Sequence, residues 1–108
     1  MAEVTLDTAR IHDWHSFHRV CAETFGFPDF YGQNMNAWID CLTYIREGDG
    51  MSSFVLGDTE QLFIALSEFE IFTGRVPEIS AELFLCVSFV NQRSVARSEK
   101  PALVLVLL

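Results

Sequence analysis

The chain has 108 residues, half of them hydrophobic, and its formal net charge is −8. This length is typical of one hydrophobic core, so we expect residues 1–108 to form a single domain. No apolar run reaches the roughly 18 residues that a membrane span needs, and the acidic start does not resemble a signal peptide. Three cysteines without framework spacing indicate free thiols in a reducing compartment. The composition therefore predicts a cytoplasmic protein with no membrane partner.

The charge is distributed unevenly along the chain. Residues 1–70 carry twelve acidic and three basic side chains, a balance of −9, whereas residues 71–108 carry three and four, a balance of +1. Such a field repels nucleic-acid phosphates and speeds encounter with a basic protein. Ordinary acidic cytosolic proteins share this balance, however. The charge thus argues against nucleic acid as a partner without naming one.

The first half of the chain predicts one strand and two helices. Residues 4–6 are typical of a short strand. We expect Asp13 to cap a helix that runs through Phe25 and ends at Gly26. Asn34 is a good N-cap for a second helix, because its side-chain oxygen can accept from a free N–H of the first turn. Four apolar residues then fall on one side of that helix: Met35, Trp38, Leu42 and Ile45.

The second half predicts two more strands, each preceded by helical or turn segments. Residues 46–57 form a turn region in which 53–56 are a candidate short strand. Residues 62–66 follow as a strand, Ser67 caps a short helix over 68–72 that ends at Gly74, and Ser80 caps an apolar helix over 81–95. The Leu/Val run at 103–107 predicts a third strand with both faces covered. Because each connection is long enough for a helical crossover, we expect parallel pairing, with Trp38 and Phe89 on the covered faces.

No arrangement of residues in the sequence predicts catalysis or a cofactor. His12, His15, His18 and Cys21 lie three residues apart, so on a helix they drift around the axis; we expect solvent-facing histidines and no metal site. Asp40 and Cys41 are adjacent and therefore point about 100° apart, which favours a packing role for Cys41. We find no phosphate-binding loop and no paired carboxylates at a telling spacing.

A polar stripe follows the cap of the second helix. Asn36, Asp40 and Thr43 recur at i, i+4 and i+7, and the loop before them contributes Phe30 and Tyr31. Polar side chains beside aromatic ones at a rigid helix start suit a contact surface better than a catalytic pocket. Asp40 is then either a solvated helix carboxylate or an anion offered to a partner's basic cluster.

The segment FPDFYGQNMNAWIDCLT, residues 27–43, resembles the signature of the barstar family, small intracellular inhibitors of a guanyl-specific ribonuclease. Twelve residues fit it identically or conservatively without a gap: Phe27, Pro28, Phe30, Tyr31, Gly32, Asn34, Met35, Ala37, Asp40, Cys41, Leu42 and Thr43. The resemblance implies a three-layer α/β fold, with a small three-stranded parallel sheet flanked by about four helices. It also implies a protein-binding module whose partner is a basic ribonuclease or another toxin. The contact residues it implies are Phe30, Tyr31, Asn34, Asn36, Asp40, Thr43 and Tyr44, with Asn91 at the rim.

The chain departs from the family at several positions. Asn36, and on our alignment Asn91, stand where the family carries acidic contacts; Ile39 replaces a tryptophan; and Tyr44 replaces a glycine that permits close approach. A neutral amide forgoes the charge-assisted part of a hydrogen bond. We therefore keep two alternatives: a housekeeping interaction domain with no nuclease target, and a hydrolase whose site the sequence does not reveal. The target and the oligomeric state stay open.

Overall fold

The computed structural model describes residues 2–108, and within them it contains one parallel sheet and four α-helices. In chain order these elements are β1 (Ala2–Leu6), α1 (Trp14–Phe25), α2 (Met35–Thr43), β2 (Leu62–Leu66), α3 (Phe69–Arg75), α4 (Pro77–Ala96) and β3 (Leu103–Leu107). A 3-10 helix, Thr8–Arg10, follows β1. The strand order is β1-β2-β3 and both pairs are parallel, so the predicted α/β class and strand pairing are confirmed.

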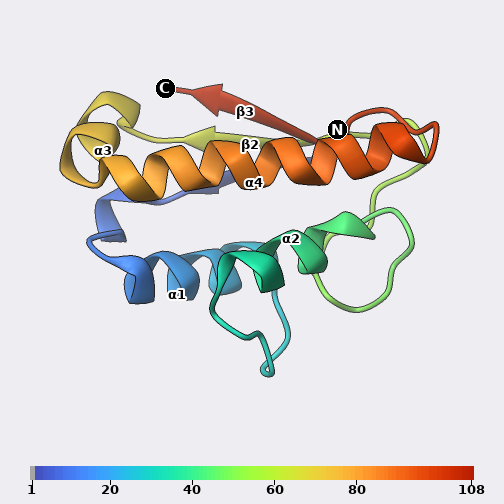
Figure 1. Ribbon diagram of the computed structural model, residues 1–108, viewed down its shortest axis with the longest axis horizontal. Helices are drawn as coiled ribbons and strands as arrows, with labels where there is room; N and C mark the ends of the chain where they lie inside the picture. Colours follow the sequence, from blue (N-terminus) through green and yellow to red (C-terminus); the bar gives the residue numbers. More distant parts are fainter. Residues whose placement is uncertain (1) are drawn as a thin grey trace.

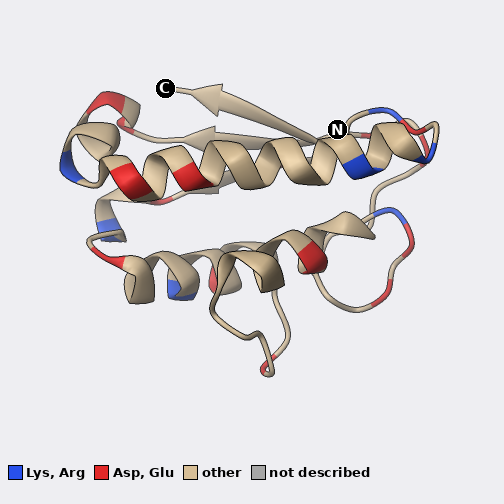
Figure 2. Ribbon diagram, viewed as in Figure 1, with Lys and Arg blue, Asp and Glu red and all other residues tan. Residues whose placement is uncertain are grey.

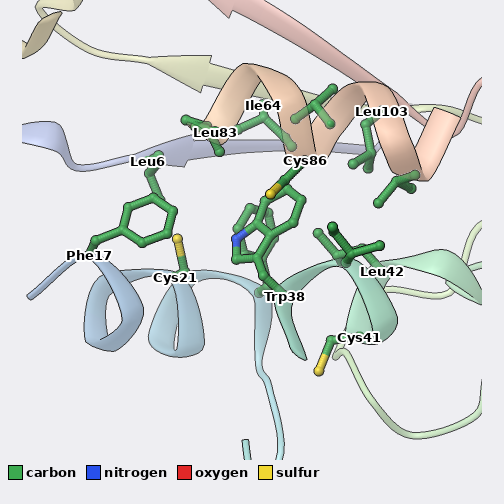
Figure 3. Close-up of a cluster of buried hydrophobic side chains, with 14 of the residues drawn as sticks. Leu6, Phe17, Cys21, Trp38, Cys41, Leu42, Ile64, Leu83, Cys86 and Leu103 are labelled. Carbon is green, nitrogen blue, oxygen red and sulfur yellow. The ribbon is translucent and has the colours of Figure 1, made fainter. Parts of the chain in front are cut away.

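One hydrophobic core lies between the sheet and the helices. In Figure 1 the sheet and α4 occupy the upper part of the molecule, and α1 and α2 the lower part. Figure 3 shows Leu6, Phe17, Ile64 and Leu103 pointing toward a common centre around Trp38. Trp38 is completely buried, as predicted. Trp38 therefore anchors α2 in the core and fixes the position of the residues that follow it in this helix.

The N-terminal ends of α1 and α2 are fixed by the caps that the sequence predicts. Asp13 accepts a hydrogen bond from the Ser16 backbone N–H at 2.8 Å, and the Ser16 hydroxyl accepts one in return, which forms a capping box. Gly26 ends α1 with φ of 70°, in the left-handed region. A Cβ there would also lie 2.5 Å from Ser53 Oγ.

The predicted boundaries of α3 and α4 are wrong. The N-cap of α3 is Glu68, and the helix continues through Gly74 to Arg75. Helix α4 begins at Pro77, because the fixed φ of proline suits a first helical position whose N–H has no intrahelical partner. Ser80 is instead buried inside α4, where its hydroxyl lies 2.9 Å from that of Thr73.

Phe89 is half exposed, so its predicted place on a covered face of the sheet is wrong. The buried stripe of α4 is set by Leu83, Val87 and Val90, and Phe89 lies about 200° around the helix from Val87. The prediction that the histidines face solvent is confirmed for His12 and His15, which are exposed. It is wrong for His18, which is buried.

Strand β3 is an edge strand, and the prediction that both its faces are covered is wrong. Leu103 is buried, whereas Val104 and Val106 are only partly buried and Leu107 is exposed. Val104 and Val106 lie in register with Phe63 and Ala65 of β2, which pair in turn with two exposed residues of β1, Glu3 and Thr5. The face of the sheet that these residues share is therefore open, and the helices cover the other face.

The candidate strand at 53–56 is absent. This segment is a loop that lies against the C-terminal end of α1 in space. The Ser53 backbone N–H donates to the Phe25 carbonyl at 2.9 Å, and that of Leu56 to the Ile45 carbonyl at 3.1 Å. The long 46–61 connection is thus fixed to α1 and to the end of α2. Within residues 2–108, no helix is both long and apolar enough to cross a membrane.

Candidate protein-contact face

The loop before α2 is held in place by a partly buried polar contact with α1. The Tyr31 hydroxyl lies 2.7 Å from Nδ1 of His18, and the Tyr31 ring packs against Phe27 with centroids 4.7 Å apart. Burial lowers the pKa of His18, with a smaller effect from the charge of His15, and burial raises the pKa of Tyr31. Tyr31 therefore anchors the loop with its hydroxyl, while Phe30 beside it is 75% exposed.

Helix α2 presents a short row of polar side chains to solvent. Asn34 caps it by accepting from the Ala37 N–H at 2.8 Å, and its amide donates to the Gly32 carbonyl at 3.2 Å. Asn36 and Asp40 are exposed one turn apart on the same side of the helix. Trp38 and Ile39 between them are buried, so the exposed pair cannot rotate away without breaking the core.

Thr43, the third member of the predicted stripe, is buried. Its hydroxyl donates to the Ile39 carbonyl at 2.7 Å and accepts from Arg93 Nη1 of α4 at 2.9 Å. The same Arg93 nitrogen lies 3.2 Å from Asp40 Oδ1 and forms an ion pair with it. Thr43 is therefore not an exposed contact residue. It contributes to the face by positioning Arg93.

A second arginine, Arg97, caps the C-terminal end of α4 and lies over the end of α2. Arg97 donates to the Thr43 carbonyl at 2.9 Å, and its guanidinium carbon lies 5.4 Å from the centroid of the Tyr44 ring. Such an arrangement is a cation–π contact. Arg97 also pairs with Glu99 at 3.0 Å. Tyr44 remains 45% exposed, with the Arg97 guanidinium over its ring.

Asn91 has an internal role in the structure. Its amide donates to the Leu103 carbonyl at 3.0 Å, and its side-chain oxygen accepts from the Leu103 N–H at 2.9 Å. These are the two backbone groups through which an edge strand would pair with a further strand. The half-buried side chain thus joins α4 to β3, and its amide is already used when no partner is bound.

The remaining polar and thiol groups do not assemble a reactive centre among the described residues. Burial raises the pKa of Cys21 to about 12 and those of Cys41 and Cys86 to about 11, so all three remain neutral thiols at pH 7. No group of three or more metal-ligating side chains comes together within residues 2–108. A hollow of about 610 Å³ between α4 and β3 is lined mainly by apolar side chains, together with Ser88, Asn91 and Gln92.

A comparison with known families gives a match that runs nearly the full length of the chain. Residues 1–106 match the family described as barstar (barnase inhibitor). The chain belongs to the barstar family. A comparison with curated proteins finds no match. The family is described as inhibitors of barnase, and in this chain the loop and α2 that resemble its signature expose Phe30, Asn36 and Asp40.

The predicted contact residues divide into two groups. Phe30, Asn36, Asp40 and Tyr44 are exposed, with Asn34 exposed beside them as the cap; Tyr31, Thr43 and Asn91 are wholly or partly buried and hold other groups. Sequence reasoning missed Arg93 and Arg97, which bring positive charge onto the same face. Their signal was present, because they lie one turn apart in residues 71–108, whose charge balance is positive.

Proposed function

We propose that this barstar-family chain is an intracellular inhibitor of, or immunity protein against, a small basic ribonuclease or another toxin. The exposed residues Phe30, Asn36, Asp40 and Tyr44 form its contact face. The single observation that carries the proposal is the fixed position of Asp40, which is 68% exposed on a helix whose neighbouring residues are anchored in the core.

The chemistry of this face suits occlusion of a partner's site rather than catalysis. Asp40 uses Oδ1 toward Arg93, and its Oδ2 makes no hydrogen bond to the described residues, so it can accept one from a partner's basic group. The exposed ring of Phe30, in the loop before α2, supplies apolar contact at low entropic cost. Three neutral, buried thiols do not supply a nucleophile. Inhibition then requires only that the bound face covers the partner's active site.

A second candidate is an interaction domain with no nuclease target. It is favoured by one observation: Asp40 is already paired with Arg93 of the same chain, and Asn36 is neutral. Both features reduce the anionic character that mimics RNA phosphates. The two candidates predict the same contact face but different partners.

Affinity capture from the native host separates them. The wild-type chain, Asp40→Ala and the control Asp58→Ala are used as baits, and bound proteins are identified by mass spectrometry. Asp58 is an exposed carboxylate in the loop before β2, so its removal changes the net charge equally. We expect a small basic ribonuclease or toxin that wild type and Asp58→Ala retain and Asp40→Ala loses. A partner that is no toxin favours the second candidate, and one retained equally by all three baits contradicts the assigned face.

A further inference from the structure

The contact face carries charges of both signs, because α4 packs against α2 and places Arg93 beside Asp40. Figure 2 shows acidic positions near the start of α4 and one basic position near its end, where α2 lies below it. Arg93 is bound to Asp40 and to Thr43, and its side chain is 49% exposed. A partner that covers Asp40 must therefore also cover Arg93.

Arg93 is held at the face independently of Asp40. Its second contact, the Thr43 hydroxyl, is buried and oriented by its own hydrogen bond to the Ile39 carbonyl. An exposed ion pair contributes little by itself, so a partner's cation can compete for Asp40. The guanidinium nevertheless stays beside it, and burying like charges together at an interface is unfavourable.

Arg93 also has N–H groups that make no hydrogen bond and could donate to a partner's carboxylate. Both of its hydrogen bonds come from Nη1, while Nη2 and Nε make none to the described residues. A guanidinium presents five N–H groups in a planar fork that matches a carboxylate. The pair Asp40–Arg93 is thus complementary to a partner that places a basic group against Asp40 and a carboxylate against Arg93.

We propose that the α2–α4 face selects a partner that presents a carboxylate to Arg93 beside the basic group that binds Asp40, and that Arg93 rejects a wholly basic site. This inference rests on the proposed function, since it assigns specificity to the same face. It makes Arg93 a specificity-determining residue of a protein whose net charge alone favours any basic partner.

The test uses barnase, the enzyme named in the family's description, as a probe, because a ribonuclease site must hold RNA phosphates and is expected to be basic. Inhibition of barnase is titrated with wild type, Arg93→Glu and Arg93→Gln, and each variant's folding is checked by a thermal melt. The matched control is Arg10→Glu. Arg10 forms an ion pair with Glu23 at 2.8 Å that is about as exposed, so this variant makes the same charge change away from the face.

We expect Arg93→Glu to bind barnase at least about tenfold more tightly than wild type, Arg93→Gln to lie between them, and Arg10→Glu to stay within about threefold of wild type. Equal gains from Arg93→Glu and Arg10→Glu would reduce the effect to overall charge and overturn the inference. No gain from either Arg93 variant would also overturn it. A gain without inhibition of any nuclease by wild type supports the specificity of Arg93 while the proposed function fails; tight wild-type inhibition with no gain does the reverse.

Discussion

The role of Asn91 gives the sharpest prediction about stability. Its amide makes two hydrogen bonds to the Leu103 backbone, at 3.0 and 2.9 Å, and joins the long helix α4 to the edge strand β3. Each such bond contributes about 0.5–1.5 kcal/mol net, so Asn91→Ala should lower the free energy of unfolding by about 1–3 kcal/mol. The lower value applies if water replaces the amide, and the higher one if the Leu103 groups remain unpaired.

The measurement is a urea unfolding titration of wild type, Asn91→Ala and the control Gln92→Ala. Gln92 is the exposed neighbour of Asn91, and its truncation should change stability by less than about 0.5 kcal/mol. Asn91→Asp is informative as well, because a carboxylate can accept from the Leu103 N–H but repels its carbonyl oxygen; we expect it to destabilise too. If Asn91→Ala leaves stability unchanged and weakens partner binding, our structural reading of this residue is refuted.

Two further predictions concern the contact face and its support. Asn36→Asp should strengthen inhibition of barnase about tenfold to a hundredfold, since a charge-assisted hydrogen bond contributes about 1.5–3 kcal/mol; an unchanged inhibition constant would show that this position does not contact the nuclease. Burial lowers the pKa of His18 below its ordinary 6.5, so the unfolded chain binds the proton more readily and stability should fall as the pH drops below about 6.5. Unfolding free energies measured from pH 7 to 5 should decline for wild type and less for His18→Gln; equal slopes would exclude His18 as the cause.

The sequence predicts much of the fold because the decisive signals are local. Asp13, Gly26 and Asn34 fix helix ends through contacts within a few residues, and short apolar runs identify the three strands. The errors have two sources. At α4 a local signal was misread: Ser80 looks like a cap, but Pro77 suits a first helical position and begins the helix three residues earlier. At Phe89 packing decides. Phe89 is as hydrophobic as its buried neighbours, yet the rotation of α4 places it outside.

The candidate face was predictable only in part, for a similar reason. The α2 stripe gives Asn36 and Asp40 correctly as neighbours on one exposed side. Thr43 and Asp40 bind Arg93, which is at least fifty residues away in the chain, and the pairing of helices that brings it there is tertiary. Helical periodicity defines one side of a helix, but it does not say which element covers it.

The central claim is that Asp40 lies at the middle of a protein-binding face. The direct test is a binding titration of wild type and Asp40→Ala against the captured partner at two salt concentrations, with a denaturant melt of each. Asp40→Ala should weaken binding by at least about 2 kcal/mol, roughly thirtyfold, because it leaves the partner's basic groups buried and unpaired. The barnase–barstar complex is the type example of such a hot spot, so this scale is the family's.

The two salt concentrations and the melt complete that test. Association of the wild type should slow as salt rises, because salt screens the −9 balance of residues 1–70. The melt should show stabilities within about 0.5 kcal/mol, since the Asp40–Arg93 pair is exposed and contributes little to folding. Affinity of Asp40→Ala equal to wild type at both salt concentrations would contradict the account and place the contact face elsewhere on the molecule.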